Sequence, residues 1–291
     1  MLFLLTIIAT ALAVPAENKW SRFRFTSLVS FGDDFTDDSR WSYYVSHNYT
    51  VPPVGWVNPV NYHAFDGGRP WVDYVKQYTG CNLYNYAISN AVCSSYLTPV
   101  TNNVPERTLP DIEAYQLPTY VAESKKKIPG KPFLNVPQAS TVYAIWIGSV
   151  EWGEFVRGNP WNRSVDDAIN CIFNQVKRLY DTGARHFVVF NVLPFDKTPV
   201  YAGPPNDVGP TWYWSTKSED HQNVTDITIS IDEYGNQLYA AKRLDLPGAE
   251  VAIFDIHGLV EDMYENPSKY LNGTAPANST GVMASSENGS M

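Results

Sequence analysis

The stretch SLVSFGDDFTDD, residues 27–38, decides the fold class of this chain. Its first five residues favour a β-strand, and Gly32 then ends the apolar run. Two adjacent carboxylates, Asp33 and Asp34, follow directly after the glycine. In a parallel sheet, ligands bind at the carboxyl ends of the strands, so acidic side chains at this point indicate a functional site.

The rest of the chain alternates between strand-like and helix-like segments. Apolar spacing of three and four residues predicts a long helix that begins after Ser164 and is closed by Gly183. Further helices are expected over residues 71–78, 120–127 and 223–244, and further strands over 142–147, 186–192 and 251–256. This alternation predicts an α/β fold with three layers, in which helices flank a parallel sheet on both faces.

Composition excludes several classes of partner. The chain has 291 residues, with 30 acidic against 21 basic, and a formal net charge of -9. No stripe of Lys and Arg is present to neutralise phosphates, so we expect no nucleic-acid partner. The basic cluster Lys125, Lys126 and Lys127 is expected on a solvated face, and no Cys/His spacing indicates a metal or another cofactor. The composition is even enough for one domain over residues 22–270, and we expect a monomer.

The N-terminus and the glycosylation motifs point to an extracellular protein. Residues 1–16 are a short apolar run followed by small residues, which predicts a secretory signal peptide rather than a membrane span. Residues 271–291 are small and polar, which predicts a disordered tail. Six Asn-x-Ser/Thr motifs behind a signal peptide favour a secreted glycoprotein, and they begin at Asn48, Asn162, Asn223, Asn272, Asn278 and Asn288.

Three cysteines are present, Cys81, Cys93 and Cys171. In an oxidising compartment Cys81 and Cys93 can pair, which leaves Cys171 free and buried.

Five segments in the same order resemble the GDSL, or SGNH, hydrolases. FGDDFTD (31–37) resembles their first block, usually Phe-Gly-Asp-Ser-x-x-Asp, and NYAISNAVCSSYLTP (85–99) their second. YAIWIGSVEWG (143–153) is similar to their third block, which usually contains Gly-x-Asn-Asp. Two later segments, 190–201 and 254–270, are similar to fungal members. The nearest subgroup is the secreted carbohydrate acetylesterases, so the resemblance implies an SGNH-hydrolase-like fold and a carbohydrate or small ester ligand.

The resemblance also assigns roles that this sequence does not keep. The family's nucleophile is a serine, and Asp34 stands at that position. Its oxyanion hole uses a second-block glycine and a third-block asparagine, replaced here by Asn90 and Val150. The late Asp-x-x-His segment that supplies the base is absent. Asp33 and Asp37 match family acids that hold the turn, so we expect a catalytically impaired or inactive member.

Other roles for the acidic residues stay open at this stage. Asp34 could itself act as a nucleophile, with a base supplied by Asp255 and His257, which share a face if they lie on a strand. The group Asp33, Asp34, Asp37 and Glu151 could bind a cation through oxygen ligands. Neither is preferred over the turn and core roles.

Two functions therefore follow from the sequence. The first is a secreted esterase of acetylated sugars whose sequence here is faulty or truncated. The second is a non-catalytic protein that binds carbohydrate or a cell-wall component in the former site, with contacts from aromatic residues near the loops: Trp56, Trp71, Trp152, Trp161 and Trp214.

Overall fold

The computed structural model describes residues 24–59, 68–99, 109–158, 161–198, 200–202 and 218–271. The expected signal peptide, the expected tail from Asn272 onward with Asn278 and Asn288, and Trp214 lie outside these ranges.

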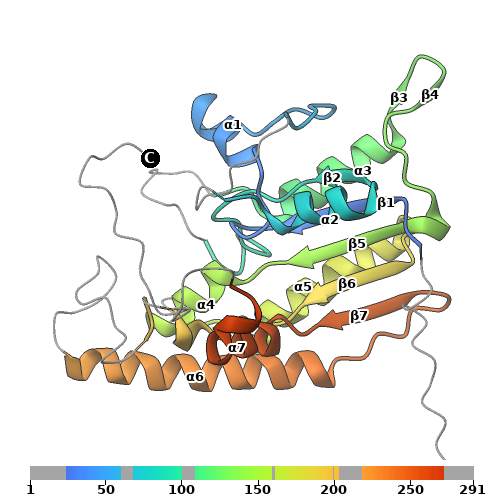
Figure 1. Cartoon of the computed structure of the whole chain (residues 1–291). Helices are drawn as coiled ribbons and strands as arrows, with labels where there is room; N and C mark the ends of the chain where they lie inside the picture. The colour runs from blue at the N-terminus through green and yellow to red at the C-terminus, as the bar shows by residue number, and fades with distance from the viewer. Residues whose placement is uncertain are drawn as a thin grey trace, which may run out of the picture.

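A five-stranded sheet forms the centre of the molecule (Figure 1). All its neighbouring strands are parallel, in the order β2-β1-β5-β6-β7. Its strands are β1 (Ser27–Gly32), β2 (Asn82–Asn85), β5 (Thr141–Trp146), β6 (His186–Phe190) and β7 (Glu250–Phe254). This confirms the α/β class and the parallel sheet flanked by helices.

Helices cover both faces of the sheet (Figure 1). Because successive strand residues point to opposite faces, Val29 and Phe31 of β1 enter the larger buried cluster, which also contains residues of α3 and α5. Leu28 enters the smaller cluster with Val72 of α2 and Ile256 of α7. The helices are α1 (Arg40–Ser46), α2 (Trp71–Thr79), α3 (Leu117–Lys125), α4 (Ser149–Val156), α5 (Val165–Asp181), α6 (Ser218–Ala241) and α7 (Ile256–Glu265).

Helix α5 follows the sequence prediction closely. Ser164 caps it through a reciprocal pair of hydrogen bonds with Asp167, and Gly183 follows its end with φ +104°. Short elements were not predicted. β2 has only four residues and a polar sequence, and α4 contains a glycine, so neither gives a clear apolar period.

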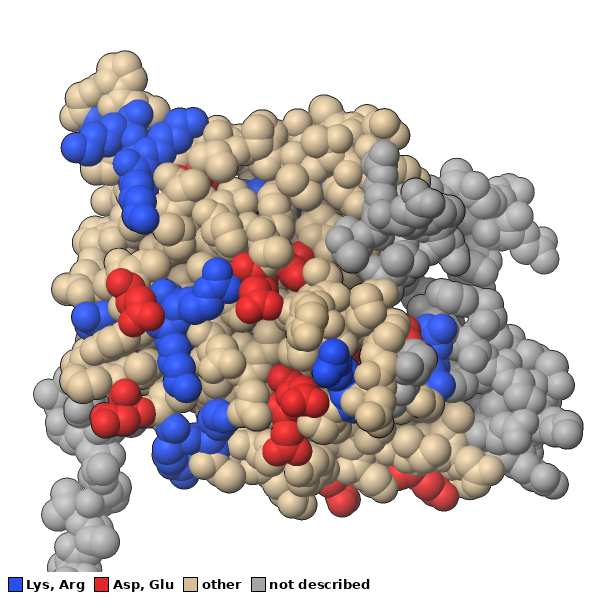
Figure 2. Space-filling view, turned by 180° about the vertical axis from the view of Figure 1, so that it is seen from behind, with Lys and Arg blue, Asp and Glu red and all other residues tan. Residues whose placement is uncertain are grey.

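A basic hairpin projects from the sheet, formed by β3 (Lys127–Ile128) and β4 (Lys131–Pro132). Figure 2 shows Lys and Arg side chains gathered there. Lys125 and Lys127 are exposed, in agreement with a solvated face.

The disulfide differs from the expected pairing. Cys93 is bonded to Cys171, and Cys81 is free and buried. Cys81 precedes β2, whereas Cys93 lies in the loop after it, beside the inner face of α5 where Cys171 points. Spacing along the sequence did not reveal this, because Cys81 belongs to the smaller buried cluster, whereas Cys93 and Cys171 belong to the larger one on the other face of the sheet. Among the described residues, no helix has the length and apolar character needed to cross a bilayer.

Candidate functional site

Three loops with polar residues meet at one edge of the sheet. Asp33 and Asp34 follow β1, Ser89 and Asn90 lie in the loop after β2, and Gly148 leads from β5 into α4. Since β2, β1 and β5 are adjacent parallel strands, their carboxyl ends lie side by side. The first, second and third sequence blocks, which are far apart along the chain, therefore lie close together in the structure.

The turn after β1 requires a glycine. A Cβ on Gly32 would lie 2.1 Å from the carbonyl oxygen of Trp146, so no side chain fits there. Gln116 holds both backbone groups of Gly32: its Oε1 accepts from Gly32 N at 3.0 Å, and its Nε2 donates to Gly32 O at 2.8 Å. The chain is thereby fixed as it leaves the strand.

Asp33 is fully buried and joins β1 to α4. Its Oδ2 accepts hydrogen bonds from Gly148 N and Ser149 N, both at 3.2 Å, and from Ser149 Oγ at 2.8 Å. Burial, and next the charge of Asp34, raise the pKa of Asp33 well above its usual range. A carboxyl group with these bonds serves to hold α4 against β1.

Asp34 lies beside it and points to the loop after β2. Its Oδ2 accepts a hydrogen bond from Asn90 N at 3.0 Å. Burial raises the pKa of Asp34, while the backbone N–H groups of Asn90 and of Asp34 itself lower it, so that burial dominates. Asn90 has φ +62°, a conformation that glycine adopts freely and asparagine tolerates. The backbone therefore presents its N–H to this site despite the side chain at residue 90.

Asp37 connects the loop after β1 to the loop after β2 through hydrogen bonds. Its Oδ1 accepts from the backbone N–H groups of Ser39 and Arg40, and its Oδ2 from Trp41 N, Ser89 N and Ser89 Oγ. Five hydrogen bonds satisfy the carboxylate and start helix α1. Ser89, Ser149 and Gln116 were not singled out from the sequence, because serine and glutamine carry no signal of their own there.

The third block supplies no polar group at residue 150. Val150 lies half-buried in the first turn of α4, and its side chain has no hydrogen-bond donor. Glu151 is buried and accepts from Cys93 N at 2.6 Å through Oε1, while its Oε2 has no hydrogen-bond partner among the described residues. Burial raises the pKa of Glu151 to about 7. Glu151 thus connects α4 to the loop that carries the disulfide.

The expected placement of Asp255 and His257 on a strand is wrong. β7 ends at Phe254, Asp255 caps α7 by accepting from Gly258 N, and His257 lies in the first turn of that helix. His257 Nδ1 lies 2.9 Å from Asn236 Nδ2, and its Nε2 lies 3.5 Å from Glu261 Oε1. Both residues follow β7, which is three strands away from β1. None of the hydrogen bonds that Asp34 accepts within the described ranges comes from a histidine.

The acidic residues do not gather as metal ligands. Within the described ranges, no group of three or more His, Cys, Asp and Glu side chains is arranged to hold a metal ion. The aromatic residues expected to contact a sugar take several different positions. Trp152 is buried in α4, Trp71 donates to Thr36 Oγ1, and Trp56 lies near Arg40.

Comparison with known proteins gives the family. The chain is 31% identical over 260 residues to an acetylesterase of Hypocrea jecorina, and the match covers 85% of this chain and 73% of the relative. The chain belongs to the acetylesterase family. A second acetylesterase, from Thermothelomyces thermophilus, is 25% identical over 181 residues, which are 59% of this chain and 55% of that relative. No family model matches the chain.

One solved structure shares a weak likeness with this member of the acetylesterase family. It is a carbohydrate esterase whose active site is described as displaying divergent catalytic and non-catalytic binding functions. The TM-score is 0.32 and the identity 13%, over 87% of this chain and 71% of that one. A likeness with so low a TM-score supports no conclusion about the candidate site of this chain.

Proposed function

We propose that this chain is a GDSL/SGNH-type acetylesterase relative that does not hydrolyse esters at the Asp34 site. The observation that carries the proposal is the hydrogen bond from Asn90 N to the Asp34 carboxylate. In a serine member of this type, the corresponding backbone N–H stabilises the negative oxygen that forms during ester cleavage. Here a carboxylate of this chain already accepts that hydrogen bond.

Three further features support an inactive site. A carboxylate at residue 34 repels a developing oxyanion, and Val150 offers no donor in place of an asparagine. Loss of one oxyanion donor alone costs roughly a hundredfold to a thousandfold in rate. Loss of the serine nucleophile removes most of what remains.

An aspartate nucleophile is disfavoured by the same contacts. Such a mechanism needs a second group that activates water and releases the covalent intermediate. The neighbour of Asp34 is Asp33, whose Oδ2 already accepts three hydrogen bonds from Gly148 and Ser149. His257, the candidate base from the sequence, is engaged with Asn236 and Glu261.

Secretion and glycosylation are part of this proposal. Asn48, Asn162 and Asn223 are exposed, as a glycosylated asparagine must be. Treatment of the secreted protein with an N-glycosidase is expected to lower its mass and to convert these three asparagines to aspartates. An unchanged mass would contradict the proposal of a secreted glycoprotein.

Hydrolysis of p-nitrophenyl acetate tests the proposed loss of activity. The purified protein and an Asp34→Asn variant are compared with buffer and with an active acetylesterase. We expect neither to release nitrophenol faster than buffer. An active parent with an inactive Asp34→Asn variant would establish an aspartate nucleophile and overturn the proposal.

A further inference from the structure

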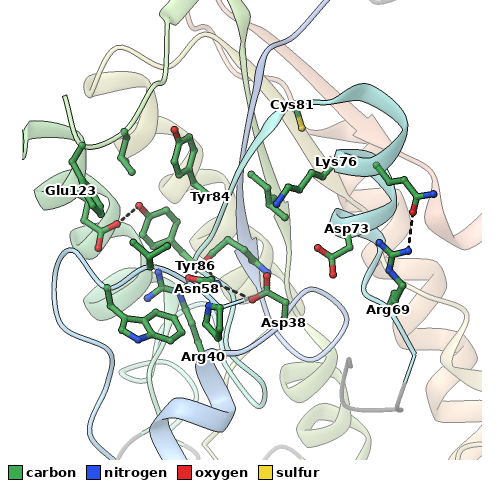
Figure 3. A pocket seen from close by; sticks show the side chains of 18 of the residues that line it. Asp38, Arg40, Asn58, Arg69, Asp73, Lys76, Cys81, Tyr84, Tyr86 and Glu123 are labelled. Carbon is green, nitrogen blue, oxygen red and sulfur yellow. Dashed lines mark hydrogen bonds between the residues drawn. The ribbon is translucent and has the colours of Figure 1, made fainter. Parts of the chain in front are cut away.

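A cavity of about 920 Å³ lies along the edge strand β2 (Figure 3). Its walls come from β2, from α2 and from the segment around Trp56, and neither Asp34 nor Asn90 is among its lining residues. Pockets of about 300–1,000 Å³ that combine apolar walls with a few polar groups are the usual size of small-molecule sites.

One wall of the cavity is rigid and aromatic. The Arg40 guanidinium lies 4.7 Å from the ring centre of Tyr86 and 5.4 Å from that of Trp56. Arg40 Nε donates to Asn85 O at 2.8 Å, and Tyr86 OH donates to Glu123 Oε2 at 2.6 Å. These contacts hold the buried ring of Tyr86 and the half-buried ring of Trp56 in place, so a ligand that packs against Trp56 meets a wall that is already ordered.

The opposite wall carries charges of both signs, and Figure 3 shows them around the cavity. Lys76 is exposed on α2, and its Nζ forms no hydrogen bond or ion pair with the described residues. Asp73, one turn before it, has a buried Oδ2 that accepts no hydrogen bond from the part of the chain that the structure describes. Asp38 lines the floor, where Asn58 Nδ2 donates to its Oδ1 at 2.8 Å.

This mixture of charges selects among ligand classes. An anionic ligand would meet Asp73 and Asp38, and a cationic ligand would meet Lys76 and Arg69. A neutral polyhydroxylated molecule avoids both conflicts, because each hydroxyl donates to a carboxylate or accepts from a cation. Its apolar ring face can pack against aromatic side chains such as Trp56 and Tyr84.

We propose that the cavity along β2 binds a neutral oligosaccharide, at a place separate from the Asp34 site. This proposal makes the carbohydrate binding expected of the chain more specific, and it assigns that binding to a surface other than the Asp34 site. It does not depend on whether the Asp34 site hydrolyses esters. Asp73 and Lys76 would bind sugar hydroxyls, and the ordered aromatic wall would face the sugar ring.

Calorimetric titration with four trisaccharides tests the proposal. Cellotriose, xylotriose and mannotriose are the neutral probes, and trigalacturonic acid is the anionic one. Each is titrated into the full chain and into two cavity variants, Lys76→Ala and Asp73→Asn. Matched controls are Lys177→Ala and Asp245→Asn, which change exposed residues outside the cavity. An Asp34→Asn variant tests whether the Asp34 site contributes to sugar binding.

The expected result is that at least one neutral trisaccharide binds the parent chain. Each cavity variant should then bind it about tenfold more weakly, as expected for loss of one hydrogen bond to a charged group. The two controls and Asp34→Asn should bind as the parent does. Near-identical melting temperatures of all variants exclude unfolding as the cause.

Four results would overturn the proposal. They are no binding of any neutral probe, cavity variants that bind like the parent, tighter binding of trigalacturonic acid than of every neutral probe, and loss of binding in Asp34→Asn alone. The last result would place the sugar at the Asp34 site. It would leave the proposed absence of hydrolysis untouched, since p-nitrophenyl acetate reports on that separately.

Discussion

At residue 34, one side chain decides which molecules the end of β1 can stabilise. A serine there is neutral and can attack an ester, whereas a carboxylate is an acceptor that competes for the same backbone donors. The contact between Asp34 and Asn90 N uses one of them. The effect is local, because Asp33 and Asp37 still accept the hydrogen bonds that hold the surrounding loops.

Replacing Asp34 by serine is therefore not expected to create an esterase. The Asp34→Ser variant should hydrolyse p-nitrophenyl acetate no faster than the parent, because within the described ranges no histidine forms a hydrogen bond with residue 34, and the side chain of Val150 has no donor. Initial rates at pH 8 provide the measurement, with Asp34→Ala as the matched control. A rise of about a hundredfold or more over Asp34→Ala would show that a base is within reach.

The sequence predicted some residue roles and missed others for physical reasons. The turn at Gly32 could be predicted, because a glycine followed by acids after an apolar run has few other interpretations. The positive φ of Asn90 could be suspected only because the resemblance to the GDSL hydrolases implies a glycine at that position. That the Asp34 carboxylate accepts from Asn90 N could not be read from the sequence, since it depends on how the β1 and β2 loops meet.

At the scale of elements, helix α5 shows how local signals specify structure. Ser164 Oγ accepts from Asp167 N at 3.0 Å, and Asp167 Oδ2 accepts from Ser164 N at 2.9 Å. Both bonds satisfy N–H groups at the helix start that would otherwise lack a partner. The apolar periodicity and the capping residue indicate the same helix start. The ends of α5 were therefore predicted to within a residue or two. Helix α7 was not predicted from the sequence, because the residues of its first turn have the pattern expected at the end of a strand.

Loss of this cap is expected to destabilise the chain measurably. Ser164→Ala should lower the free energy of unfolding by about 1 kcal/mol, as measured by urea denaturation. Ser164→Thr is the control, because threonine keeps both the capping hydroxyl and the glycosylation motif at Asn162. The proteins are compared after removal of N-glycans. Equal stability of Ser164→Ala and Ser164→Thr would show that the cap contributes nothing.

The disulfide links the loop after β2 to α5 across 78 residues of sequence. Replacing Cys93 and Cys171 by serine together is expected to cost about 2–5 kcal/mol of stability. Cys81→Ser, which removes the buried free thiol, is the matched control. Thiol titration of the unfolded parent should find one free thiol. A result of three free thiols, or equal stability of all variants, would contradict this pairing.

At the scale of the whole molecule, buried acids make stability depend on pH. Burial raises the pKa of Asp38 to about 6, of Glu151 to about 7 and of Asp232 to about 8. In the unfolded chain the pKa of such groups is about 4. Between these values the folded state holds protons that the unfolded state has released, so stability falls as the pH rises.

The melting temperature should therefore be higher near pH 5 than near pH 8. Differential scanning calorimetry across this range measures the effect, with buffers of equal ionic strength. Asp232→Asn removes one of the groups and should reduce the pH dependence. Asp245→Asn, an exposed acid, should leave it unchanged. A melting temperature that rises from pH 5 to pH 8 in the parent would contradict the prediction.

The whole fold was more predictable than the arrangement of its ligand-facing surfaces. Buried apolar strands such as β1, β5 and β6 have simple patterns, so the parallel sheet followed from them. The cavity along β2 was not predicted, because β2 is short and polar and because Arg40, Trp56 and Asp73 come from separate segments. Surfaces of this kind depend on tertiary packing.

The contact between Asp34 and Asn90 is the central claim and can be measured directly. In ¹⁵N-labelled protein, the amide resonance of Asn90 is followed as a function of pH in the parent and in Asp34→Asn. We predict that in the parent it shifts with an apparent pKa above the usual aspartate value, because burial raises the pKa of Asp34. In Asp34→Asn this shift should be absent. An Asn90 amide that does not respond to pH in the parent, or responds equally in the variant, would contradict the account.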